Sequence, residues 1–141
     1  MAKQGGGHFV HCDVGEPADN AAAVGEAVSR YGGLHIVALN AGVAIDTGIN
    51  DGLDPVKYRR AMAINLDGVV YGAYAAHSAL RASGGGDSIV TASIAGLLAA
   101  HLHPVAGRNT ARVGGVARAC GPFCRSTGGR THMLDPGIAS P

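Results

Sequence analysis

Two short, continuous apolar runs, LHIVAL at residues 34–39 and SIVTA at residues 88–92, do most to limit the fold of this chain. Runs of this length are typical of strands that are buried on both faces, as in a parallel sheet. Residues 56–80 lie between them and predict a helix, because Asp54 supplies a capping carboxylate and Pro55 a favourable first helical residue. Strand, helix and strand in this order predict a βαβ unit with parallel strands.

The same alternation of short apolar and longer amphipathic segments continues on both sides of this unit. Residues 8–14 (HFVHCDV) and 131–134 predict short strands, residues 20–31 predict a helix, and residues 113–119 fit part of another helix. We therefore expect an α/β fold with βαβ units and a mostly parallel sheet, in a single domain that spans residues 1–141.

Composition excludes several classes of protein and partner. With 47% hydrophobic residues and a formal net charge of +1, the chain is too apolar and too nearly neutral to be disordered. Residues 101–141 carry five arginines, but they are spread out with Phe123 as their only aromatic neighbour, so we expect no nucleic-acid partner. Apolar runs are too broken for a membrane span. Three cysteines, an odd count, predict a reduced, cytoplasmic protein.

The residues that follow each predicted strand are candidate binding residues, because ligands of open parallel sheets bind beyond the carboxyl ends of the strands. Small residues there leave room for a flat ligand, and polar ones offer hydrogen bonds. The candidates are Asp13, Val14, Asn40, Ala41, Gly42, Ser93, Pro136 and Gly137. Each is also an ordinary residue for a turn between a strand and a helix, so a purely structural role stays open for any one of them.

Five motifs, in order along the chain, resemble the short-chain dehydrogenase/reductase (SDR) superfamily. They are CDV at 12–14, YGGLHIVALNAG at 31–42, MAINLDGVVYG at 62–72, GDSIVTASIAGL at 86–97 and DPGI at 135–138. The resemblance implies a partial Rossmann-like α/β fold with a doubly wound, mostly parallel sheet. It also implies an oxidoreductase that moves a hydride between NAD or NADP and an alcohol or ketone substrate. It also implies a homo-oligomer that associates through the 56–80 helix.

The resemblance assigns roles to single residues. Its cofactor contacts are Asp13 and Val14 at the adenine, Asn40, Ala41 and Gly42 under the cofactor, and Pro136, Gly137 and Ile138 at the nicotinamide. As catalytic residues it implies Ser93, which would hydrogen-bond the substrate oxygen, and Asn65, which would order a proton-relay water. Burying the Asn65 amide is costly without partners, and a bond to nearby backbone is the structural alternative. No metal site is expected, because the histidines and cysteines lack ligand spacing.

Two departures from the family pattern limit the activity that we expect. The family moves the substrate proton with a Tyr and a Lys, but the matching positions hold Ala106 and Thr110. Residues 5–7 are glycines that follow no apolar strand, so they do not match the family's phosphate-binding turn. We therefore expect a truncated chain that lacks the first βαβ portion and is impaired or inactive as an enzyme. The alternative is a non-enzymatic degenerate fragment or a dimerising scaffold subunit.

Overall fold

A computed structural model describes residues 6–44, 52–93, 113–118, 121, 125 and 128–135. Its elements follow one another as α1 (Pro17–Tyr31), β1 (Ile36–Leu39), α2 (Pro55–Met62), the π-helical segment η2 (Ala63–Asp67), α3 (Gly68–Ala82), β2 (Asp87–Thr91) and β3 (Arg130–Leu134). Residues 113–118 are also helical. None of the described helices has the length and apolar character that crossing a bilayer requires.

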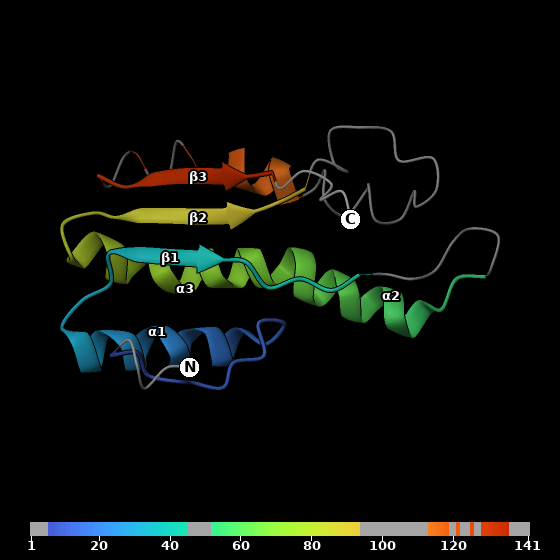
Figure 1. The fold of residues 1–141 in the computed structure, drawn as a ribbon, viewed down its shortest axis with the longest axis horizontal. Helices are drawn as coiled ribbons and strands as arrows, with labels where there is room; N and C mark the ends of the chain where they lie inside the picture. Colours follow the sequence, from blue (N-terminus) through green and yellow to red (C-terminus); the bar gives the residue numbers. More distant parts are fainter. Residues whose placement is uncertain are drawn as a thin grey trace.

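The sheet confirms the parallel α/β fold expected from the sequence. Its three strands lie in the order β1-β2-β3, and all three point the same way (Figure 1). β1 pairs with β2 from Ile36 opposite Asp87, and β2 pairs with β3 from Asp87 opposite Arg130. The carboxyl ends of the three strands therefore meet at one edge, where residues 40–44, 92–93 and 135 follow them.

The core lies on one face of this sheet. Val69 of α3, Val90 of β2 and Val113 are each at most 4% exposed, and they form the buried cluster with Ala117. On the opposite face Ile36 of β1 is 60% exposed. The expected burial of the 34–39 run on both faces is therefore wrong for the described residues, because no described element covers the side of the sheet that carries Ile36.

The strand expected at residues 8–14 is also wrong, since these residues have no strand structure. A strand exists only where a neighbour accepts and donates its backbone hydrogen bonds. Within the described residues the sheet consists of β1, β2 and β3, and residues 8–14 pair with none of them. They lead instead into a turn before α1, in which the Glu16 amide donates to the Asp13 carbonyl over 2.9 Å.

The helix expected at 20–31 begins earlier, at Pro17, and ends before Gly32, whose φ of 80° fits the left-handed helix terminus. The helix expected at 56–80 is confirmed as α2, η2 and α3 in direct succession. As expected, the Asp54 carboxylate caps it by accepting from the amides of Val56 and Lys57. The sequence did not indicate the π-helical turn at residues 63–67, which lies near the carboxyl ends of the strands.

Candidate functional site at the carboxyl ends of the strands

One side chain fastens the loop after β1 to the helix that follows it. The Asn65 amide belongs to η2, and its Oδ1 accepts from the Val43 amide over 2.8 Å. Its Nδ2 donates to the Val43 carbonyl over 2.9 Å. Both ends of the amide are thus bonded to the backbone of a single residue. This satisfies the Asn65 side chain in the way that the structural alternative requires, and it fixes the position of residues 40–44.

A cavity of about 250 Å³ opens at this loop. It is lined by the residues that follow β1, by the end of β2 and by two helical residues: Asn40, Ala41, Gly42, Val43, Ala44, Thr91, Ala92, Asn65 and Val113. Four of the residues predicted from the sequence, Asn40, Ala41, Gly42 and Asn65, are therefore brought together. Ser93 follows Ala92 directly and is half-buried.

A second cavity, of about 190 Å³, lies on the α1 side of the same strand end. Asn40 and Ala41 line both cavities, and here they meet Val14 and Cys12 from the segment before α1. The structure thus brings predicted residues from two distant parts of the sequence to one end of the sheet. Gly68 allows this approach, because a Cβ atom at this position would lie 2.9 Å from Cγ2 of Val14.

Asp13 lies between Cys12 and Val14, and its carboxylate is held by two donors. Oδ1 accepts from the Gly15 amide over 3.0 Å, and Oδ2 accepts from Nη2 of Arg60 in α2 over 2.8 Å. The hydrogen bond from Arg60, followed by the one from Gly15, lowers the pKa of the Asp13 carboxyl group below its ordinary value. The same ion pair raises the pKa of Arg60. Asp13 is therefore an ionised acceptor at neutral pH.

Arg60 is the residue of this site that sequence reasoning missed. Two arginines, Arg59 and Arg60, stand next to each other in the sequence, and only one can face Asp13 from α2. The only available signal was a basic residue on the same predicted helix as Asn65. Which of the two arginines turns toward Asp13 depends on how α2 packs, and the sequence pattern does not contain that information.

Other reactive groups do not add a nucleophile or a metal centre to the described part of the site. Burial, followed by the negative charges of Asp19 and Asp13, raises the pKa of the Cys12 thiol, which keeps it protonated and unreactive. Nowhere in the described ranges do three or more His, Cys, Asp or Glu side chains gather where an ion could be held. Pro136, Gly137 and Ile138 lie outside the described residues, as do positions 106 and 110.

The residues gathered at this end of the sheet suit one part of a nucleotide, namely its base. An ionised carboxylate accepts hydrogen bonds only, so Asp13 suits an amino group on a heterocyclic ring. Val14 adds an apolar wall next to it, and the small residues Ala41 and Gly42 leave space over the end of β1. In the described segments no glycine-rich turn runs from a strand into a helix, so a site for a diphosphate group is not among these features.

Comparison with known proteins gives a consistent set of relatives. The family model described as Enoyl-(Acyl carrier protein) reductase matches residues 1–140. The Short-chain dehydrogenase reductase ATA1 of Arabidopsis thaliana is 32% identical over 96% of this chain and 50% of its own length. Cyclohexanol dehydrogenase of Acinetobacter sp. (strain SE19) is 35% identical over 86% of this chain and 49% of its own length.

A solved structure agrees with these sequence matches. A short chain dehydrogenase from Mycobacterium smegmatis superposes with a TM-score of 0.85 and 26% identity, over 92% of this chain and 53% of its own. An alcohol dehydrogenase from Thermococcus sibiricus, complexed with 5-hydroxy-NADP, has the same fold, with a TM-score of 0.83 at 20% identity. The chain spans about half the length of the curated relatives that it matches.

Proposed function

The chain belongs to the short-chain dehydrogenase/reductase superfamily, and on that premise we propose that it binds NAD or NADP and acts on an alcohol or ketone. The observation that carries the proposal is the meeting of Val14, Asn40 and Ala41 at one cavity beyond the parallel strands. Relatives named cyclohexanol dehydrogenase and 3-alpha-(or 20-beta)-hydroxysteroid dehydrogenase support this substrate class. The proposed setting is the cytoplasm, where the cysteines stay reduced.

In this proposal the adenine end of the cofactor lies at Asp13 and Val14. Asp13 accepts a hydrogen bond from the adenine, and Val14 packs beside the ring. The cofactor passes over the end of β1, where the residues are small enough to leave room for it: Asn40, Ala41 and Gly42. At the other end, the nicotinamide is lined by Pro136, Gly137 and Ile138. When bound, the nicotinamide supplies or accepts the hydride.

Ser93 and Asn65 serve the substrate side of the proposed site. The Ser93 hydroxyl donates a hydrogen bond to the substrate oxygen. This bond polarises the substrate carbon to which that oxygen is attached. Asn65 holds residues 40–44 in place through Val43. Its amide has one more hydrogen on Nδ2 and one more lone pair on Oδ1, which suffice to order a water molecule. Neither the methyl group of Ala106 nor the weakly acidic hydroxyl of Thr110 can act as the general acid, so we expect turnover to be slow.

A second function, a scaffold subunit without catalysis, is favoured by one observation on α3. Val70 is 42% exposed and Tyr74 is 85% exposed, and the two lie one turn apart on the same face of this helix. They line a largely apolar groove of about 600 Å³. Contiguous exposed apolar groups of this kind mark interaction surfaces. In this version the chain forms a homo-oligomer through the 56–80 helix.

Titration of the full chain with NADH and NADPH, followed by a ketone-reduction assay, tests the first proposal against the second. Saturable quenching or enhancement of nicotinamide fluorescence supports the cofactor site. Loss of a general acid typically lowers the rate by about 10²–10⁴-fold, so we expect turnover in that reduced range. If neither nucleotide binds at millimolar concentration and the chain forms a stable oligomer, the enzyme proposal is wrong and the scaffold proposal stands.

A further inference from the structure

The ion pair between Asp13 and Arg60 joins two segments that lie 47 residues apart in the sequence. It sits at the surface, because the Arg60 side chain is 54% exposed and the Asp13 side chain is 28% exposed. Exposed ion pairs of this kind contribute little to folding stability. Folding stability alone therefore does not explain why α2 presents an arginine here. The position of the pair suggests a role in binding, because Cys12 and Val14, on either side of Asp13, line a cavity.

The Asp13 carboxylate has acceptor sites that remain open, and its orientation is fixed. Each of its oxygens has two lone pairs. Gly15 occupies one site on Oδ1 and Arg60 one site on Oδ2, so each oxygen keeps one further acceptor site. Two bonds from different elements allow a single orientation of the carboxylate plane. An arginine is suited to this task, because its planar guanidinium loses little freedom when it forms the bond.

We propose that Arg60 is a positioning residue for the adenine, which holds the Asp13 carboxylate so that its remaining acceptor site receives the adenine amino group. This inference rests on the proposed cofactor site at Asp13 and Val14. It adds a residue from α2 that does not itself touch the reacting atoms, and it predicts which base the site accepts. Adenine presents an amino donor at this place, whereas hypoxanthine presents a carbonyl oxygen, which a carboxylate repels.

The close packing around Gly15 supports the same arrangement. A Cβ atom at Gly15 would lie 3.3 Å from Oδ1 of Asp13 and 3.4 Å from Nη1 of Arg60. The guanidinium thus lies over the turn that carries Asp13 rather than reaching it from a distance. Two neighbours favour the ionised forms of the pair: His11 adds to the lowering of the pKa of Asp13, and Glu16 adds to the raising of the pKa of Arg60.

Binding of two dinucleotides to the full chain and to three variants tests the role of Arg60. The probes are NAD and nicotinamide hypoxanthine dinucleotide, measured by calorimetry. We expect the unchanged chain to prefer the adenine form by about tenfold or more, as for a hydrogen bond to a charged group. R60Q should weaken NAD binding by about three- to tenfold and leave the hypoxanthine form unchanged. R60K should restore part of the preference.

R59Q is the matched control, because it removes the same charge from the adjacent, exposed residue of α2. We expect it to bind both dinucleotides as the unchanged chain does. If R60Q keeps the preference for adenine, or if R59Q lowers it equally, the role of Arg60 is refuted while the proposed cofactor site stands. If the unchanged chain binds neither dinucleotide, both proposals fail. Circular dichroism verifies that the variants fold, and a general loss of structure would lower both affinities together.

Discussion

A single amide, that of Asn65, holds the loop after β1 against η2. N65A removes both hydrogen bonds to Val43, each of which contributes about 1 kcal/mol. We therefore expect N65A to lower the free energy of unfolding by about 1–2 kcal/mol. Dinucleotide binding should weaken as well, because residues 40–44 lose their anchor. Urea denaturation followed by circular dichroism measures the change in stability.

N40A serves as the control for the stability measurement alone, because Asn40 is an exposed residue of the same loop and belongs to the proposed cofactor site. A surface change of this kind alters stability by about 0.5 kcal/mol at most. N65D is expected to be as unstable as N65A, since its carboxylate can accept from the Val43 amide but opposes the Val43 carbonyl. An unchanged urea midpoint for N65A would mean that the Asn65 amide does not hold the loop.

Between elements, the contact of α3 with β1 depends on a glycine. A Cβ atom at Gly72 would lie 2.5 Å from Cδ2 of Leu39. We expect G72A to lower the free energy of unfolding by about 1–3 kcal/mol, because overpacking outweighs the gain in helix propensity. Thermal denaturation measures the loss, and combining G72A with L39A should recover part of it.

Gly25 in α1 offers the matched control, since a Cβ atom there would meet nothing within 4 Å. G25A makes the same chemical change in another helix of the same length. It should raise stability by about 0.5–1 kcal/mol through helix propensity alone. Equal effects of G72A and G25A would show that the close approach of α3 to β1 is not what selects glycine at position 72.

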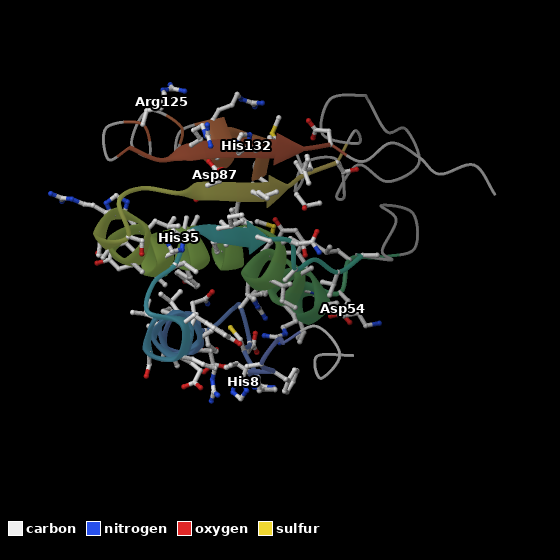
Figure 2. All side chains as sticks on the ribbon, turned by 60° about the vertical axis from the view of Figure 1, so that its left-hand side comes forward. His8, His35, Asp54, Asp87, Arg125 and His132 are labelled. Atoms are coloured by element: carbon white, nitrogen blue, oxygen red, sulfur yellow. The ribbon has the colours of Figure 1, made fainter. Side chains whose placement is uncertain are left out.

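An ion pair joins Asp87, the first residue of β2, to Arg130, the first residue of β3. Arg130 donates to both oxygens of Asp87, over 2.8 and 3.1 Å, and His132 lies 3.5 Å from Oδ1 (Figure 2). The Arg130 hydrogen bond lowers the pKa of Asp87 in the folded chain. The folded chain thus binds this proton less readily than the unfolded chain, so the contribution is present above about pH 3.9. It is lost as the pH falls through the lowered value.

Arg130 bonds both oxygens of Asp87, and this bidentate geometry gives even an exposed ion pair a measurable, small contribution to stability. We therefore expect R130Q to lower the urea midpoint slightly at pH 6 and to differ less from the unchanged chain at pH 2. R125Q is the control, because Arg125 is exposed and the pKa shift of Asp87 does not depend on it. A difference between R130Q and the unchanged chain that persists at pH 2 would contradict the ion-pair explanation.

How far the sequence predicts each element depends on what that element requires. The run at 34–39 and the Asp54 cap are local signals, and both elements were predicted. The segment at 8–14 was also predicted as a strand from its apolar residues, but a strand needs a partner as well, and periodicity does not reveal one. The same holds for the site: the strand ends could be predicted from the order of the elements, whereas the partner of Asp13 depends on the packing of α2.

At the scale of the whole molecule, two of the apolar surfaces that the described residues leave exposed concern the association of chains. One is the α3 surface, where Tyr74 is 85% exposed, and the other is the open face of the sheet, where Ile36 is 60% exposed. The proposed homo-oligomer uses the first of them. Replacing Tyr74 by Glu puts a charge on the α3 surface, and burying an unpaired charge in an interface is strongly unfavourable.

We therefore expect Y74E to convert the oligomer to a monomer in size-exclusion chromatography with light scattering, at a concentration at which the unchanged chain is associated. Y31E is the matched control, because it makes the same substitution on α1, where the Tyr31 side chain is 59% exposed. I36K tests the open face of the sheet in the same way. If I36K produces the monomer and Y74E does not, the chain associates through its sheet, and the 56–80 helix is not the interface. An unchanged chain that is monomeric at all concentrations would refute the proposed homo-oligomer.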